Sequence, residues 1–233
     1  VISQARQGSL TSNALTEGEK ILSSNNINQY FIILRPEPHA NIINTHLELY
    51  NEEKYVLLES ELMATLVDFP DSINVKNLLA ATYLALRRYD EALTRYGEVL
   101  RLKPNFSDAH YNRGIVFEKK RNYPKAIHCY ENAIRINSKN AKAITNLGNL
   151  FHLQGRVSEA LELFARAVKI DPNFVEAINN LGNSYKESGD IERALGLYIK
   201  AFVLKEDYAE PIYNLTFILR SYEFSAPSKE LQI

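Results

Sequence analysis

The feature that most constrains this chain is a period of 34 residues that starts near Ile73 and persists to the last part of the sequence. The same chemical type returns at several positions of the period. One series, in the second half of each unit, is aromatic: Tyr96, Tyr130, Phe164 and Tyr198. Another, a few residues earlier, is alanine: Ala92, Ala126, Ala160 and Ala194. Such a period is typical of stacked units that are each too small to bury their own apolar face, and it favours a binding surface over a catalytic domain.

The unit from Ala141 to Phe174 indicates what each repeat folds into. In its first half, residues at i, i+3, i+4 and i+7 form one helical stripe: Ile144, Leu147, Gly148 and Phe151. The same spacing returns in its second half: Ala160, Leu163, Phe164 and Ala167. Between the two stripes, Gly155 suits a turn with a positive φ angle. Pro172 then ends the second helix, because proline lacks an amide hydrogen and clashes with the preceding turn.

This helix–turn–helix pattern resembles the tetratricopeptide repeat (TPR). Four units carry it in register, starting at residues 73, 107, 141 and 175, and a degenerate unit starts at 39. A final helix starts at 209. Arg113, Ser138 and Glu206 depart from the residues that are usual at their positions.

The resemblance implies an all-α fold, a right-handed superhelical solenoid of antiparallel helix pairs over residues 39–222. We expect residues 1–38 to form an N-terminal helical extension. Residues 223–233 are predicted to be a linker, or the start of a further segment.

Composition narrows the class of protein. The chain has 233 residues, 45% of them hydrophobic, and no apolar run approaches the ~20 residues that cross a bilayer, so we predict no membrane insertion. Cys129 is the only cysteine, which leaves no disulfide framework and no cysteine-based metal site. These features favour the cytoplasm. The chain begins at Val1 rather than methionine, so the possibility that a leader sequence was removed stays open.

Charge is unevenly distributed along the sequence. Residues 73–142 hold 14 Lys and Arg against 6 Asp and Glu, a net of +8, within a chain whose total is −1. This basic segment is interpreted as a solvated face, with attraction of an acidic partner as the alternative. Nucleic-acid binding is not predicted, because it calls for exposed aromatics among the basic residues, and here the aromatics occupy core positions of the repeat.

The most informative polar feature is a series of asparagines, again 34 residues apart: Asn112, Asn146, Asn180 and Asn214. The TPR resemblance implies that the helix carrying them lines a concave groove. An amide side chain offers an acceptor and two donors, so it can bond the backbone of an extended peptide whatever the peptide's side chains are. The series is similar to the asparagine ladder in the repeats of O-GlcNAc transferase. We add four residues to the candidate peptide-binding set: Asn149, Asn183, Tyr111 and Lys142.

Alternatives stay open at these positions. The amides can instead tie neighbouring repeats together. A carboxylate clamp for a peptide C-terminus is less favoured, because the ladder position of the final units holds Asn180 and Asn214 rather than a cation. Charged pairs such as Glu118 with Lys119, and Lys186 with Glu187, lie where groove-lining charges are expected. The histidines share no ligand spacing, and no motif predicts catalysis, a metal or a cofactor.

Two function classes follow. The first is a non-catalytic scaffold that binds a protein or peptide. The second is the substrate-recruiting region of a larger glycosyl-, sulfo- or methyltransferase, because the stretch from Ile43 to Ser72 is similar to TPR regions that precede such domains. The helix from Ala209 presents Ile212, Leu215 and neighbouring apolar residues without a following helix. We therefore expect a second copy or a downstream domain to cover that end.

Overall fold

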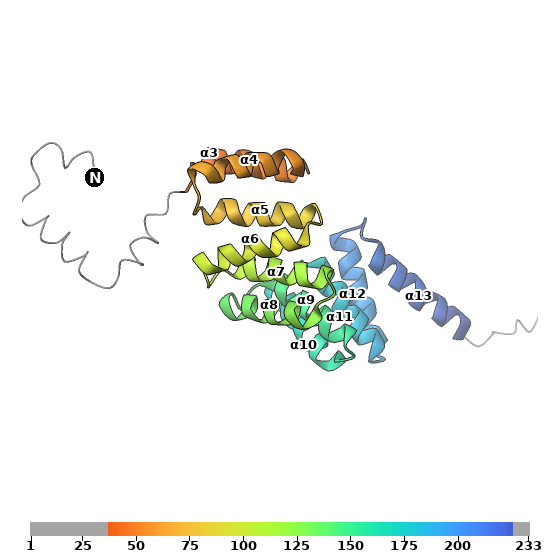
Figure 1. Cartoon of the computed structure of the whole chain (residues 1–233). Helices are drawn as coiled ribbons and strands as arrows, with labels where there is room; N and C mark the ends of the chain where they lie inside the picture. The colour runs from red at the N-terminus through yellow and green to blue at the C-terminus, as the bar shows by residue number, and fades with distance from the viewer. Residues whose placement is uncertain (1–36, 226–233) are drawn as a thin grey trace, which may run out of the picture. The chain divides into compact units, whose positions relative to one another are not determined.

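The computed structural model describes residues 37–225, and within them it contains eleven helices and no strand (Figure 1). In chain order the helices are α3 (Ala40–Asn51), α4 (Tyr55–Asp68), α5 (Ile73–Ala85), α6 (Tyr89–Leu102), α7 (Ser107–Lys119), α8 (Tyr123–Ile136), α9 (Ala141–Leu153), α10 (Val157–Ile170), α11 (Val175–Glu187), α12 (Ile191–Leu204) and α13 (Ala209–Ser225). No helix in this part of the chain is long and apolar enough to cross a bilayer.

The chain divides into two compact units, residues 1–79 and 80–233, with the boundary inside α5. In the second unit, each helix packs on its neighbour in sequence. The tightest pairs are α7 with α8, α9 with α10 and α11 with α12, and each pair packs on the next. The prediction of an all-α solenoid built from helix pairs is therefore confirmed.

The turn inside each pair repeats as strictly as the helices do. Gly155 has a φ of 77°, as the sequence predicted, and Gly189 has a φ of 84°. The equivalent positions in the three earlier units are also left-handed although they are not glycine: Glu53, Arg87 and Arg121, with φ angles of 58°, 60° and 56°. A left-handed residue with a Cβ costs about 1–2 kcal/mol. Packing of the two helices therefore outweighs the local preference of these three side chains.

Three helix pairs, α7–α8, α9–α10 and α11–α12, each close over a glycine that faces a ring. A Cβ built on Gly114 would lie 2.5 Å from the nearest ring carbon of Tyr130. Gly148 faces Phe164 in the same way, and Gly182 faces Tyr198. These rings are buried. The close approach explains why glycine and an aromatic residue recur together in the period.

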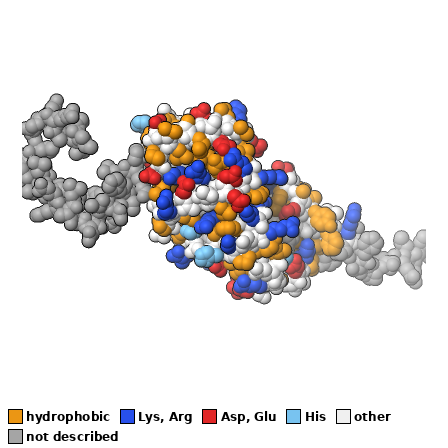
Figure 2. Space-filling view, viewed as in Figure 1, with side chains coloured by type: hydrophobic (Ala, Val, Ile, Leu, Met, Phe, Trp, Pro, Cys, Tyr) orange, Lys and Arg blue, Asp and Glu red, His pale blue; other side chains and the backbone are white. Residues whose placement is uncertain are grey.

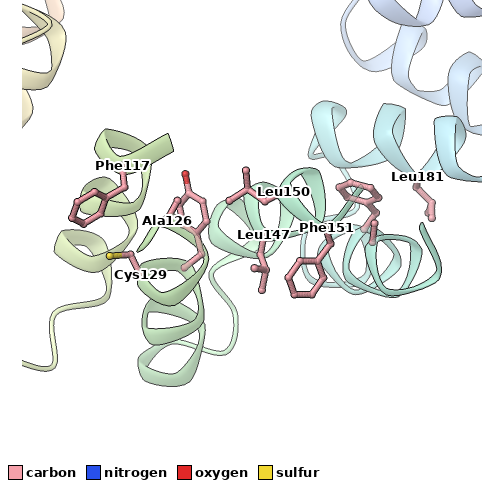
Figure 3. Packing of buried hydrophobic residues seen from close by; sticks show 10 residues of the cluster. Phe117, Ala126, Cys129, Leu147, Leu150, Phe151 and Leu181 are labelled. Atoms are coloured by element: carbon pink, nitrogen blue, oxygen red, sulfur yellow. The ribbon is translucent and has the colours of Figure 1, made fainter. Parts of the chain in front are cut away.

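The core of the second unit runs through successive pairs as a continuous apolar cluster (Figure 3). Its buried residues come from α7 to α11: Phe117, Ala126, Cys129, Tyr130, Leu147, Leu150, Phe151, Ala160, Phe164 and Leu181. Burial raises the pKa of the Cys129 thiol, which keeps it protonated and suits a packing role.

The first unit has its own buried contacts between α3 and α4. Leu58 and Leu62 are fully buried, and the buried His46 ring lies 3.4 Å from the Thr65 hydroxyl. Ser72 donates a hydrogen bond to the Glu37 carboxylate just before α5. These contacts hold the N-terminal helices of the described region together.

Two predicted segments lie mainly outside the described residues. The N-terminal extension, residues 1–38, falls almost wholly before residue 37. The C-terminal segment, residues 223–233, falls mostly beyond Ser225, where α13 ends.

Candidate functional site

The candidate asparagines lie on the first helix of successive pairs. Asn112 is on α7, Asn146 on α9, Asn180 on α11 and Asn214 on α13. The first three are half-buried, and Asn214 is 8% exposed. The Asn112 side chain makes no hydrogen bond within the described part of the chain, whereas the other three each bond to another helix.

Asn146 belongs to a cluster of hydroxyls between α7, α8 and α9. Its amide nitrogen donates to the Tyr130 hydroxyl at 3.2 Å, and Tyr130 in turn donates to the Glu118 carboxylate at 2.6 Å. Tyr111 lies beside this cluster, with its ring centroid 6.0 Å from that of Tyr130. Burial, with the nearby charges of Glu176 and Glu118, raises the pKa of Tyr111 to about 12. Both tyrosines are therefore neutral hydrogen-bonding groups.

A second cluster links α9, α11 and α13 through amides. Asn180 donates to the Asn149 oxygen at 2.8 Å. One unit later, Asn214 donates to the Asn183 oxygen at 3.0 Å, and Asn183 also accepts from the Tyr198 hydroxyl at 2.8 Å. The asparagine of one helix thus bonds the asparagine of the preceding first helix at two successive steps.

The two asparagine pairs, Asn180 with Asn149 and Asn214 with Asn183, differ in one neighbouring hydroxyl group. Tyr198 gives its hydroxyl to Asn183, but the equivalent ring in the preceding unit is Phe164, which has none. Asn149, the counterpart of Asn183, therefore has no such hydroxyl donor, and its oxygen accepts only from Asn180 within the described residues. A ring hydroxyl at this core position therefore changes which hydrogen bonds the neighbouring asparagine makes.

Residues from α11 and α13 extend the cluster. Asn179 is fully buried and donates to the Glu210 carboxylate at 2.9 Å, and the Tyr208 hydroxyl donates to the same oxygen at 2.7 Å. The Lys186 ammonium donates to the Asn214 oxygen at 3.1 Å. These bonds fix the Glu210 carboxylate and the Asn214 amide in position.

The second cluster surrounds a hollow of about 1100 Å³ between α9, α11 and α13, which we call the main hollow. The polar residues on its wall include four asparagines and two carboxylates: Asn149, Asn180, Asn183, Asn214, Glu176 and Glu210. Burial raises the pKa of Glu176, and the charge of Glu210 raises it further, so the two carboxylates repel each other. Lys205 also lines the hollow but forms no ion pair with the described residues.

The structure brings together some of the predicted residues and separates others. Four of the candidate asparagines line the main hollow, while Asn146 and Tyr111 belong to the neighbouring hydroxyl cluster. Lys142 lines a different hollow of about 310 Å³, and Asn112 has no partner among the described residues. Glu118 and Asn149 both border a third hollow of about 450 Å³.

Sequence reasoning missed the acidic side of the main hollow. Glu176 and Glu210 occupy the position of Lys142 one and two periods later. The 34-residue spacing could therefore have predicted that they lie on the same helix face as the candidate residues. Tyr213, which lines the same wall, stands one period after the buried Asn179. Within the described residues, no cluster of histidine, cysteine or acidic side chains is arranged to hold a metal ion.

Family models agree with the repeat pattern. Tetratricopeptide repeat models match residues 107–140, 129–162 and 175–207, and a TPR repeat model matches 80–121 and 148–189. Together they run without a gap from residue 80 to 207, more than half of the chain. The chain belongs to the tetratricopeptide repeat family. No curated protein sequence matches this TPR chain.

Solved structures of TPR proteins share the fold at low sequence identity. TTC0263, a thermophilic TPR protein of Thermus thermophilus, superposes with a TM-score of 0.62 at 19% identity, covering 77% of this TPR chain and 98% of its own. MamA from Desulfovibrio magneticus RS-1 gives 0.61 at 20% identity, covering 75% and 98%. YrrB, described as a TPR protein with an unusual peptide-binding site, gives 0.55 at 22% identity, covering 80% and 96%.

Proposed function

We propose that this TPR chain is a non-catalytic scaffold that binds an extended segment of a partner protein along its asparagine side chains. The observation that carries the proposal is the convergence of four asparagines on the wall of one hollow. YrrB, which shares the fold, is described as having a peptide-binding site. Protein interaction is also the role that a solenoid surface suits best, because the stacked helices present a long continuous face.

The hydrogen-bonding state of the amides supports recognition of a peptide backbone. Asn146 and Asn180 use their nitrogens in bonds to Tyr130 and Asn149, while their oxygens accept no hydrogen bond within the described part of the chain. An oxygen held in place in this way is ready to accept from a backbone N–H, and little side-chain entropy is lost on binding. The internal bonds thus orient the amides, and their structural role and their binding role are compatible.

Binding of this kind also fits the second function class. A substrate-recruiting region of a larger transferase would use the same surface in the same way, with catalysis on another domain. The full-length open reading frame separates the two classes. A nucleotide-sugar or other cofactor motif in a further domain would assign this region to an enzyme, and its absence would favour the adaptor.

The test replaces two asparagines together, Asn146→Ala and Asn180→Ala. A binding peptide is first selected from a random library displayed on phage, and its affinity is then measured by titration calorimetry. Each lost amide contact should cost about 0.5–1.5 kcal/mol, so the double variant should bind roughly tenfold more weakly or worse. Thermal melting of the double variant checks that its helices stay folded.

Asn132→Ala is the matched control, because Asn132 on α8 bonds only to nearby His128 and Arg135. It should leave peptide affinity unchanged. Unaltered affinity in the double variant would show that the asparagines serve only to join neighbouring helices.

A further inference from the structure

We propose that the main hollow is a side-chain pocket that selects a lysine or arginine of the bound peptide. This inference rests on the proposed function and adds to it the identity of the side chain that the surface reads. It is carried by the size of the hollow, by two carboxylates that form no ion pair within the described residues, and by an exposed aromatic ring beside them.

The hollow has room for a long side chain. Its volume is about 1100 Å³, and α9, α11 and α13 contribute its walls. Backbone-binding asparagines and the hollow are continuous, because Asn149 and Asn180 lie on its wall. A peptide held by those amides would therefore direct a neighbouring side chain into this space.

Neither carboxylate forms an ion pair within the described residues, and Glu210 is held by hydrogen bonds instead. One oxygen of Glu210 accepts from both Asn179 and Tyr208, at 2.9 and 2.7 Å, and its other oxygen has no partner within the described residues. Glu176 lies on the same wall, beside Asn149 and Asn180, and makes no ion pair in that same region. Two negative charges on one wall attract a cation and disfavour an acidic side chain.

The cations of this neighbourhood do not neutralise the pair. Lys186 bonds the Asn214 oxygen, and Lys205 lies on the rim without an ion pair among the described residues. Lys142 is the cation that acts on Glu176, and it lies in the adjacent hollow. A guanidinium or ammonium from the ligand would fill the role that no side chain of the described chain takes.

The aromatic ring of Tyr213 is the independent observation. It is 71% exposed on the wall of the hollow, although the side chains at the same register position one and two periods earlier, Asn179 and Thr145, are fully buried. A tyrosine face within reach of a cation adds attraction through its ring quadrupole, and arginine stacks on such rings particularly well. An exposed ring beside two carboxylates matches the chemistry of a basic side chain.

The inference is tested with two capped nonapeptides of glycine, serine and alanine that differ only at the central residue, arginine in one and citrulline in the other. Citrulline has nearly the same shape and no charge. Each peptide is titrated into ¹⁵N-labelled protein, and dissociation constants are taken from the shifts of α11 and α13 amide signals. We expect the arginine peptide to bind about tenfold more tightly, with the advantage shrinking in 1 M salt.

The variant Glu176→Gln with Glu210→Gln should bind both peptides equally, at the affinity of the citrulline peptide. Glu162→Gln, on α10 and away from the main hollow, is the control and should keep the tenfold preference. Equal binding of both peptides to the unmodified protein overturns the inference and leaves the proposed function standing. A phage-selected peptide that binds without perturbing α11 or α13 places the binding surface elsewhere and overturns both.

Discussion

The contact between Gly148 and Phe164 gives the sharpest test of how the repeats are held together. A Cβ on Gly148 would lie 2.6 Å from Phe164 Cε1 and 3.0 Å from Cδ1, inside any normal carbon contact. Phe164 is 2% exposed and belongs to the central apolar cluster, so its ring has no free space to move into. Overpacking of this kind costs about 1–3 kcal/mol. Alanine also gains about 1 kcal/mol over glycine inside a helix, so the net loss for Gly148→Ala should be about 0–2 kcal/mol.

Gly196→Ala measures the gain in helix propensity alone, without the overpacking that Gly148→Ala also causes. Gly196 lies inside α12, and a Cβ there meets nothing within 4 Å. This variant should gain about 0.5–1 kcal/mol, so the two variants should differ by about 1–3 kcal/mol. Urea denaturation followed by circular dichroism at 222 nm measures the gap, which is about 0.5–1.5 M in midpoint for a slope on the order of 2 kcal/mol per M. If Gly148→Ala stabilises as much as Gly196→Ala, the close helix approach assigned to this glycine is wrong.

Two further predictions concern the last two helix pairs. The folded state raises the pKa of Glu176, mainly through burial and then through Glu210 and Glu118, with Asn149 and Lys142 opposing. The folded protein therefore holds this proton more tightly than the unfolded chain does, and stability falls as pH rises through that window. Glu176→Gln should consequently raise the free energy of unfolding slightly at pH 7, by less than ~1 kcal/mol because solvent in the open hollow screens the carboxylate, and leave it unchanged well below pH 4, as urea denaturation at the two pH values measures. On α13, Ile212 and Phe217 are 41% and 58% exposed and do not line the main hollow, and apolar side chains are visible over this helix in Figure 2. We expect the mass from light scattering to rise with concentration as a second copy covers them, and Phe217→Asp to keep the chain monomeric; an unmodified chain that stays monomeric near millimolar would count against this.

Most of the fold could be predicted from the 34-residue spacing. Helices α5, α7, α9, α11 and α13 begin 34 residues apart because the same apolar stripe restarts at that interval. The same spacing placed Gly148 and Phe164 on the apolar stripes of the two helices, but the direct contact between them is seen only in the structure. The left-handed turns at Arg87 and Arg121 did not, because nothing in an arginine side chain indicates a positive φ. Only comparison with Gly155, at the same place in its unit, would have pointed to them.

The site was predictable in its residue types and not in its partners. The spacing of Asn180 and Asn214 indicated a common helix face, and both do lie on the wall of the main hollow. Which atoms they bond depends on side chains from other helices, such as the Tyr198 hydroxyl that occupies Asn183. A pattern read along one helix contains no information on such contacts between helices.

The positions off the apolar stripe explain why the C-terminal pairs of this solenoid form a hollow of distinct chemistry. In three successive pairs the core keeps a glycine that faces a ring, at Gly114, Gly148 and Gly182. The polar position that holds Lys142 becomes Glu176 and then Glu210, and the position of Thr145 becomes Asn179 and then Tyr213. Lys142, Glu176 and Glu210 are all exposed, so a change of charge at this position disturbs the packing of the helices little. Thr145 and Asn179 are fully buried, whereas Tyr213 is 71% exposed, so an aromatic ring is presented at this position only in the last unit. The charge of the main hollow therefore arises from substitutions at an exposed position of the repeat, which the packing of the core leaves free to vary.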